Sequence, residues 1–493
     1  MIVPGFQHNG PLSNERITKQ SLAFAAGYDF GSQMIRHLTL TLLVLCALAP
    51  SVNAQKKRIH YKPTWESLDK HKTPQWLMNG KLGLFIYGVA PAKEEWRAYW
   101  KKRGKPNQKY NYQWLAWNSG KWDPKGLAKL AEDMGARYLV FGIGYPFVNY
   151  PSKYANVKES EIRVVRGPKG QANYDYVGEI AREVRKRGLK FGTIYGYRHP
   201  GKHPFWFKSM KEVIDIYQPK TLWWDDDKLS YSAEQLRSRE MIAYYYNHLK
   251  KPEEGATEDA LGSHKIKTFG LEQHHGDWFR IEARYKPARE TIAKGYYIRY
   301  EEFFKADWIT PTNEQPKGLV STYLQWLIHT TAHNGNLELA ISWNNGPYMP
   351  LMKRQLRQVG DWLAVNGEAI YGTRPWRAGK PQGRTTSKIH IRYTTKKNSL
   401  YAILFGWPGT SLTIPNLAFQ LGTKVEMLGR RVPDSSLNWV AEKKGVKIII
   451  PYTGSASSGP VNYADPSKLV YKTVVPCDHA YSIKITPIPK WVK

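Results

Sequence analysis

Cysteine is nearly absent from this sequence of 493 residues, which contains Cys46 and Cys477 and no others. Cys46 lies in a segment that we expect to be removed, so the mature chain keeps one thiol and forms no internal disulfide. A chain of this length has room for two or three domains and for a large hydrophobic core. The lack of disulfides therefore fits a large domain that needs no covalent staples, whether cytosolic or exported.

Acidic residues are also scarce. The 41 Asp and Glu residues face 73 Lys and Arg residues, which gives a formal net charge of +32. A surface with this excess attracts polyanions such as nucleic acid, anionic lipid, and sulfated or uronic polysaccharide. A generically basic, soluble surface is the alternative. The sequence has no arginine-rich tail and no nucleic-acid-binding motif, so we expect no nucleic-acid partner.

Long apolar runs are missing too. The apolar stretch at residues 38–49 is too short to span a bilayer comfortably, and no other segment is a transmembrane candidate. Residues 34–54 are typical of a secretory signal, because positive residues precede that stretch and small residues follow it up to Ala54. We expect translation to start at Met34, with residues 1–33 as an upstream extension; a disordered leader is the alternative. The mature chain then begins after Ala54 and is secreted or periplasmic.

The sequence does contain a repeated alternation of amphipathic helices and apolar runs. Leu127, Leu130, Ala131 and Met134, for example, follow the i, i+3, i+4, i+7 spacing of one helical face. The expected helices cover residues 124–134, 177–187 and 207–217, and the apolar runs that follow them cover residues 137–145, 189–197 and the stretch from 221 onward. Runs that are apolar throughout are typical of strands buried on both faces. Together with a first strand at 81–88, these cycles predict a parallel sheet with outer helices in a (β/α)8-like barrel.

The second half of the expected barrel is less regular, and residues 250–264 are polar and loop-like. Near Trp376 the composition changes, and residues 377–387, rich in Gly, Pro, Arg and Thr, indicate a linker. Short strand-like runs separated by turn residues follow, which predicts a C-terminal antiparallel β-sandwich. We therefore expect a barrel domain at 55–376 and a sandwich domain at 388–493.

One apolar run, which starts at residue 221, ends abruptly in three carboxylates, Asp225, Asp226 and Asp227. In a (β/α) barrel the catalytic groups lie where strands end and βα loops begin. An acid at the end of a buried strand is therefore a candidate catalytic group. A cap-and-turn cluster or a cation site is the alternative, and we interpret Asp226 and Asp227 as polar loop residues.

A series of motifs resembles, in order and spacing, the α-L-fucosidases of glycoside hydrolase family 29. The motifs include Lys81-Leu82-Gly83-Leu84-Phe85-Ile86, Tyr217-Gln218-Pro219 before Leu222-Trp223-Trp224-Asp225, His275-Gly276-Asp277 before Glu282, and Gly360-Asp361-Trp362-Leu363. The resemblance covers about residues 60–487. It implies hydrolysis of α-L-fucosides with retention, by an Asp nucleophile and a Glu acid/base. Catalysis by two carboxylates needs no metal and no organic cofactor.

By motif, the nucleophile position falls on Asp225 and the acid/base position on Glu282, which lies seven residues after His275. Retention requires the two carboxyl groups to lie roughly 5–5.5 Å apart. The nucleophile must stay ionised, whereas the acid needs a raised pKa. The alternative for Glu282 is an ion-paired surface acid, because Arg280 and Arg284 flank it and a neighbouring Arg lowers the pKa of a carboxyl.

Aromatic residues near the two acids offer apolar faces for a sugar ring: Trp223, Trp224 and Trp278. Packing in the core is the alternative for Trp223 and Trp224. Histidine is a candidate metal ligand in general, but we interpret His274 and His275 as loop residues and expect no metal site.

The sequence departs from the family at its sugar-binding motifs. The family's His-Trp-Gly and His-His-Asp-Gly runs are replaced by Tyr87-Gly88-Val89 and Gly144-Tyr145-Pro146-Phe147, its Asn-Asp-Arg stretch by Glu258-Asp259-Ala260, and its Leu-Leu-Asn run by Leu337-Glu338-Leu339. In the family the histidines hold the fucose hydroxyls. Tyr87 and Tyr145 can each replace one such hydrogen bond, but not the geometry or the charge.

Two hypotheses follow from these departures. The first is an active secreted glycosidase that acts on terminal α-L-fucosyl residues of an oligo- or polysaccharide; the basic surface favours a sulfated glycan. The second is a non-catalytic glycan-binding relative that kept the barrel. A basic structural or cell-surface protein without a sugar site is a third, weaker reading. The sugar, the linkage and the oligomeric state are left open by the sequence.

Overall fold

A computed structural model gives the fold, in which His60–Lys493 form one compact unit. The described residues, apart from a few isolated positions at 97–104 and at 234, are 58–87, 122–144, 147–196, 204–225, 237–258, 275–282, 296–302, 320–341, 349–430, 436–451 and 477–492. The expected signal segment, with Met34 and Ala54, lies outside them.

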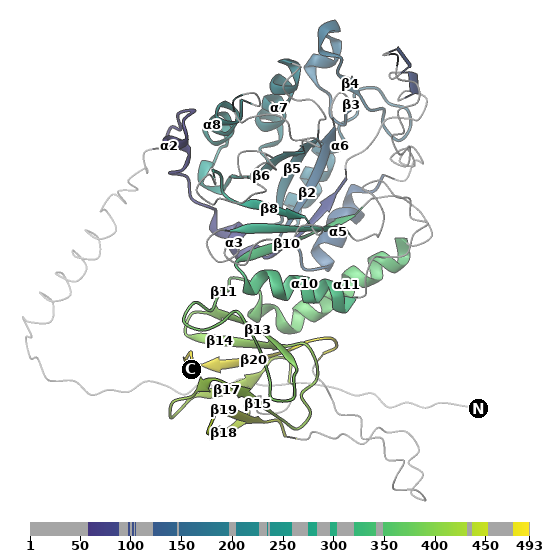
Figure 1. The fold of residues 1–493 in the computed structure, drawn as a ribbon. Helices are drawn as coiled ribbons and strands as arrows, with labels where there is room; N and C mark the ends of the chain where they lie inside the picture. Colours follow the sequence, from purple (N-terminus) through teal and green to yellow (C-terminus); the bar gives the residue numbers. More distant parts are fainter. Residues whose placement is uncertain are drawn as a thin grey trace, which may run out of the picture. The chain divides into compact units, whose positions relative to one another are not determined.

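Eight parallel strands form one sheet within the described part of the chain, in the order β7-β6-β5-β2-β1-β10-β9-β8 (Figure 1). The strands are β1 (Leu82–Ile86), β2 (Tyr138–Gly144), β5 (Lys190–Gly196), β6 (Thr221–Asp225), β7 (Ala256–Thr257), β8 (Phe279–Glu282), β9 (Tyr297–Glu302) and β10 (Gly335–Ile341). A parallel bridge between Glu258 and Trp278 joins β7 to β8, the two ends of this order, so the sheet curls back onto itself. The predicted (β/α) barrel is confirmed.

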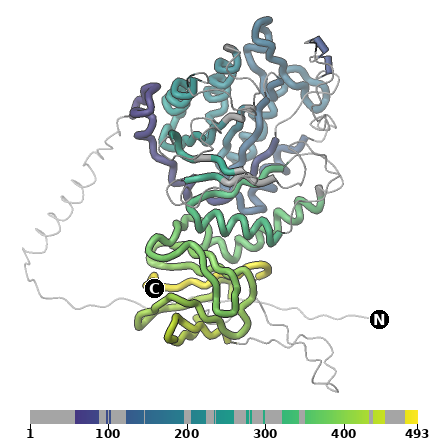
Figure 2. Tube along the Cα trace, in the orientation of Figure 1, coloured from purple at the N-terminus to yellow at the C-terminus, as the bar shows by residue number. Residues whose placement is uncertain are grey.

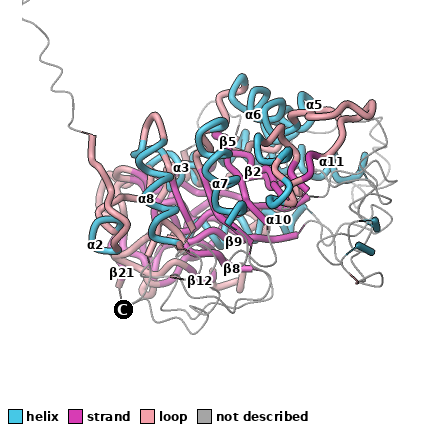
Figure 3. The backbone as a smooth tube through the Cα atoms, turned by 90° about the horizontal axis from the view of Figure 1, so that it is seen from above, coloured by secondary structure: helices cyan, strands magenta, loops and turns pink. Residues whose placement is uncertain are grey.

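The main helices lie outside the strands, as the view from above also shows (Figure 3). They are α5 (Pro124–Asp133), α6 (Tyr176–Lys186), α7 (Pro204–Tyr217), α8 (Ser238–His248), α10 (Val320–Ala332) and α11 (Met349–Asn366), preceded by the short α2 (Trp65–Leu68) and α3 (Gln75–Gly80). The Asp123 carboxylate accepts the N–H of Gly126 at 2.8 Å and caps α5, and Asp175 caps α6 in the same way. Local sequence thus fixes where these helices start.

Shorter elements lie in the connections between strands and helices. They are β3 (Phe147–Val148), η2 (Lys153–Asn156), η3 (Lys158–Ser160), β4 (Arg163–Val164), η5 (Pro252–Glu254) and η9 (Gly367–Ala369). Of these, η5 falls in the stretch 250–264 predicted as a loop, and so does the barrel strand β7. The charged residues of η5 make that stretch polar, and β7, with two residues, is too short to show a strand period.

The C-terminal part contains antiparallel sheets, and the predicted sandwich is confirmed. Its strands are β11 (Arg374–Pro375), β12 (Gln382–Arg384), β13 (His390–Lys396), β14 (Ser399–Leu404), β15 (Ser411–Pro415), β16 (Leu417–Ala418), β17 (Lys424–Met427), β18 (Asn438–Glu442), β19 (Gly445–Ile449), β20 (Tyr481–Thr486) and β21 (Lys490–Trp491). The late strand β20, yellow in Figure 2, pairs with β14 and β17. The predicted linker is wrong in part, because β12 pairs with β13 as a short edge strand whose Gln-Gly-Arg sequence carries no strand signal.

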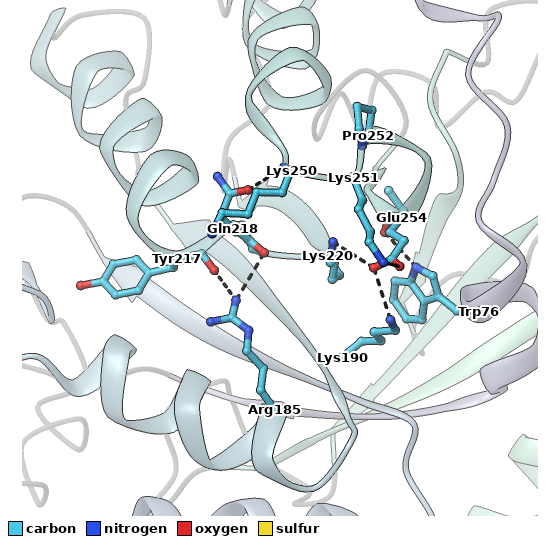
Figure 4. A network of polar contacts seen from close by, with 12 residues as sticks. Trp76, Arg185, Lys190, Tyr217, Gln218, Lys220, Lys250, Lys251, Pro252 and Glu254 are labelled. Atoms are coloured by element: carbon cyan, nitrogen blue, oxygen red, sulfur yellow. Dashed lines mark hydrogen bonds and ion pairs between the residues drawn. The ribbon is translucent and has the colours of Figure 1, made fainter. Parts of the chain in front are cut away.

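At the amino-terminal end of the barrel strands, the Glu254 carboxylate forms ion pairs with three lysines (Figure 4). Glu254 lies 3.0 Å from the Lys220 ammonium, 3.3 Å from that of Lys190 and 3.4 Å from that of Lys251. Its backbone carbonyl accepts the indole N–H of Trp76 at 2.8 Å. These contacts tie the start of β5 and the residue before β6 to η5, at the end of the barrel opposite to the one where catalytic groups lie.

Candidate active site

Strand β6 places Asp225 at its carboxyl end. Asp225 is the last residue of the strand and is the register partner of Gly196, the last residue of β5. Two positions earlier, Trp223 is 1% exposed and belongs to the cluster that fills the barrel. Because strand residues two apart share a face, position 225 falls in the same phase of the alternation as Trp223. The side chain of Asp225 is outside the described residues.

Strand β8 places Glu282 in the equivalent position. Glu282 ends this strand opposite Tyr300 of β9. Only β7 separates β6 from β8 in the ring of strands. All strands of this sheet run parallel, so both acids stand at the same rim. The Glu282 side chain, like that of Trp224, is outside the described residues.

Aromatic rings pack the interior below that rim. The Trp223 ring lies 6.0 Å from the Trp278 ring and 5.9 Å from the Phe85 ring, between centroids. Tyr87, just after β1, is half-buried, and its ring centroid lies 4.7 Å from that of Phe85. Trp223 and Trp278, each 1% exposed, form a tightly packed floor. A direct contact of these residues with a sugar stays a prediction, and Tyr145 lies outside the described residues.

A buried ion pair lies within the same interior. The Arg280 Nε lies 3.2 Å from Glu258 Oε1, and their side chains are 3% and 4% exposed. The Arg280 guanidinium carbon also stands 4.6 Å from the centroid of the Trp223 ring. Arg280, predicted only as a neighbour that perturbs Glu282, is thus part of the packed barrel.

Glu338, in the middle of β10, is a second buried acid of the interior. Burial raises its pKa to about 8, although the Tyr138 hydroxyl and the positive charge of Arg280 act in the opposite direction. The carboxyl is therefore mostly neutral at pH 7. At the other end of the barrel, burial lowers the pKa of Lys81 to about 7, with a further contribution from the charge of Arg374.

Two models of known protein families match this chain. The model of α-L-fucosidase matches residues 47–368, and the model of the α-L-fucosidase C-terminal domain matches residues 383–465. The chain belongs to the α-L-fucosidase family. It is therefore a member of a family of glycoside hydrolases.

Individual members of the α-L-fucosidase family match over most of their length. An α-L-fucosidase of Branchiostoma floridae is 28% identical over 454 residues, which cover 82% of this chain and 94% of the relative. The human tissue α-L-fucosidase is 25% identical over 496 residues, 91% of this chain and 97% of the relative. A Thermotoga maritima α-fucosidase solved with a mechanism-based inhibitor has a TM-score of 0.63 at 24% identity and covers 86% of this chain and all of its own. This last likeness supports the fold.

No described helix has the length and apolar character that a membrane span requires. Likewise, no group of three or more His, Cys, Asp and Glu residues among those described is placed to hold a metal ion.

The sequence did not predict that three charged residues, Glu258, Arg280 and Glu338, are buried inside the barrel. Glu258 and Glu338 were noticed only as departures from the family pattern, and Arg280 only as a flanking residue. A usable signal was present, because Trp278, Arg280 and Glu282 follow one another at intervals of two residues and so face the same side of an extended stretch. A charged residue in phase with a buried one is expected to be buried and paired.

Proposed function

We propose that this protein is an exported, retaining glycoside hydrolase that releases terminal α-L-fucosyl residues, with Asp225 as nucleophile and Glu282 as acid/base. The observation that carries the proposal is the placement of two acidic residues at the carboxyl ends of β6 and β8, one strand apart, in the barrel of a fucosidase-family chain. Family membership supports the fucoside as substrate, and the signal-like stretch at 34–54 supports export.

The proposed reaction proceeds in two displacements. The Asp225 carboxylate attacks the anomeric carbon while the Glu282 carboxyl donates its proton to the leaving glycosidic oxygen. A covalent fucosyl-enzyme forms and the aglycone departs. Glu282, now ionised, takes a proton from water, whose oxygen displaces Asp225 from the anomeric carbon. Two inversions at one carbon give net retention.

The proposed substrate class is a fucose-containing glycan with sulfate groups. The motifs that hold the fucose hydroxyls in the family are absent here, and Tyr87 stands where a histidine is usual. A tyrosine donates a hydrogen bond without carrying a positive charge, so recognition of the sugar itself is weakened. The net charge of +32 supports attraction of an anionic polymer instead.

A division into a barrel domain at 55–376 and a sandwich domain at 388–493 is also proposed. The two family-model matches, at 47–368 and 383–465, support it. The barrel helices and the C-terminal sheets nevertheless share hydrogen bonds, such as the one from the Trp362 indole N–H to the Ala480 carbonyl at 2.9 Å.

Hydrolysis of aryl α-L-fucosides and of sulfated and desulfated fucans tests the proposal. Asp225→Asn should lower kcat by at least about a thousandfold. Glu282→Gln should lower kcat/KM roughly a hundredfold or more for a poor leaving group, but little for dinitrophenolate, whose departure needs no proton. The kcat of this variant should fall for both substrates, because the second displacement loses its base. Glu240→Gln, which makes the same change at an ion-paired acid on α8, should be unaffected. No turnover of any fucoside by the unaltered protein would refute the proposal.

A non-catalytic glycan-binding protein is the second candidate, and the loss of the family's histidine motifs favours it. Its signature is saturable binding of a fucosylated glycan that Asp225→Asn leaves unchanged, without any turnover. Isothermal titration with the sulfated fucan measures this directly.

A further inference from the structure

Arg280 makes contacts that join three barrel strands just beneath the proposed site. It belongs to β8, its Nε lies 3.2 Å from the carboxylate of Glu258 after β7, and its guanidinium carbon lies 4.6 Å from the ring of Trp223 in β6. Both side chains of the ion pair are almost fully buried, at 3% and 4% exposed. Burying two charges carries a desolvation penalty that an apolar pair would avoid, so the pair is not explained by stability alone.

The positions that Arg280 connects are those that precede the two acids. Arg280 stands two residues before Glu282, and Trp223 stands two residues before Asp225. In a strand, residues two apart share a face, so each contact lies one step below an acid. A planar guanidinium that both pairs with a carboxylate and lies against an aromatic ring has few other orientations, which makes it a rigid spacer.

We infer that Arg280 is a positioning residue that fixes the separation between β6 and β8, and with it the separation of Asp225 and Glu282. The inference rests on the proposed function, because it assigns Arg280 a part in that reaction. A retaining enzyme needs its carboxyls roughly 5–5.5 Å apart. A misplacement of about 1 Å can lower a rate about a hundredfold. A rigid link beneath the acids therefore affects the reaction rate more than it affects the stability of the fold.

The test replaces the pair as a unit. Arg280→Met alone would leave the buried Glu258 carboxylate without this cation, whereas the double variant Arg280→Met/Glu258→Gln removes both charges at similar volume. We expect this double variant to fold, as judged by circular dichroism and thermal unfolding. Its kcat on an aryl α-L-fucoside should fall about ten- to a hundredfold while KM changes less than about threefold. Its pH–rate profile should shift, because the proton equilibria of the two acids depend on their separation.

Two further variants separate positioning from loss of charge and from simple destabilisation. Arg280→Lys keeps a cation for Glu258 but loses the planar guanidinium that lies against Trp223, so kcat should still fall about tenfold or more while the fold is kept. The control is His71→Gln, which breaks the buried pair between His71 Nδ1 and Asp277 Oδ1, 2.7 Å apart, with side chains 3% and 2% exposed. Asp277 lies two residues before β8. This control should lower the melting temperature and leave the pH–rate profile unchanged.

The outcomes are distinguishable. A folded double variant with the original kcat and pH–rate profile would overturn the role of Arg280 while leaving the proposed function intact. The role of Arg280 would also be overturned if His71→Gln lowered kcat as much as the double variant does for the same loss of melting temperature. If the unaltered protein hydrolyses no fucoside, or if Asp225→Asn keeps full activity, the proposed function fails and the role of Arg280 falls with it.

Discussion

At the scale of single residues, two glutamates of the barrel have pKa values far from that of an ordinary surface acid. Glu338 is 2% exposed, and burial raises its pKa to about 8. Glu254, at the amino-terminal end, is partly exposed; burial would raise its pKa, but hydrogen bonds and the charges of Lys220 and Lys190 lower it to about 2. The same residue type therefore titrates in opposite directions at two places in one barrel.

Glu338 makes the folded state more stable in acid. Between the usual carboxyl pKa of 4.5 and the folded value of about 8, the folded protein holds a proton that the unfolded chain has released. Stability from this group is thus fully present below 4.5 and is lost as the pH rises toward 8, by about 1.4 kcal/mol per pH unit. Glu338→Gln should flatten the dependence of melting temperature on pH between about pH 5 and about pH 7.

The control for this experiment is Glu254→Gln. The stability that Glu254 contributes is present above its usual pKa of 4.5 and is lost as the pH falls through about 2. This variant should lower the melting temperature equally at both pH values and leave the slope unaltered. An unchanged slope in Glu338→Gln would contradict a neutral Glu338.

At the scale of elements, the barrel strands depend on where glycine makes room for large side chains. A Cβ built on Gly83 of β1 would stand 2.3 Å from the Tyr138 ring of the neighbouring β2. Tyr138 is fully buried, so its ring has no solvent-facing side to move toward. The pairing of a glycine with an aromatic ring thus sets how β1 and β2 fit together.

Gly83→Ala should lower the free energy of unfolding by about 1–3 kcal/mol, the usual range for overpacking. The control is Gly406→Ala, where the nearest atom to a new Cβ, in Ile389, lies at an ordinary 3.8 Å. We expect the control to stay within about 0.5 kcal/mol of the original protein. Urea unfolding midpoints measure both, and equal midpoints for the two variants would contradict this account of the interior.

The helices of the barrel were predictable because each carries its own local signals. The stripe of Leu127 and Met134 and the cap at Asp123 are readable one residue at a time, and α5 starts at the predicted Pro124. Strand β7, only two residues long, shows no period, and its place is set by pairing with β6. Strand β9, Tyr297–Glu302, carries three charged residues among its six and was not expected, since the prediction relied on fully apolar runs.

The candidate site was predictable in part for the same reason. The strand end at Asp225 follows from an apolar run that stops at an acid. Glu282, which also ends a strand, was assigned from the family resemblance alone. The ion pair of Arg280 and Glu258 joins strands about twenty residues apart in the sequence, and no local pattern links them. Long-range pairing inside a closed sheet is decided by register, which a single sequence does not display.

At the scale of the whole molecule, the feature of most consequence is charge. A net charge of +32 on 493 residues creates a field that attracts polyanions well beyond contact distance at low salt. Screening shortens that reach to about 10 Å at 0.1 M salt and about 3 Å at 1 M. The dependence of activity on salt concentration therefore shows whether this field helps to attract an anionic substrate to the protein.

We expect kcat/KM on a sulfated fucan oligosaccharide to fall roughly tenfold between about 0.05 and 0.5 M NaCl, because screening weakens its attraction to the basic surface. For a neutral aryl α-L-fucoside the change should stay below about twofold. Steady-state kinetics on both substrates, with the desulfated oligosaccharide as control, measure the difference. Equal salt dependence for all three would show that the charge plays no part in substrate capture.

The central claim is that Asp225, at the end of β6, attacks the sugar. The most direct measurement is mass spectrometry of the protein after incubation with a 2-fluoro-fucosyl fluoride, whose fluorine slows the second displacement so that the covalent intermediate accumulates. The account predicts one fucosyl adduct per chain, located by peptide mapping on Asp225 and absent from Asp225→Asn. An adduct on another residue, or turnover of fucosides without any adduct on Asp225, would contradict it.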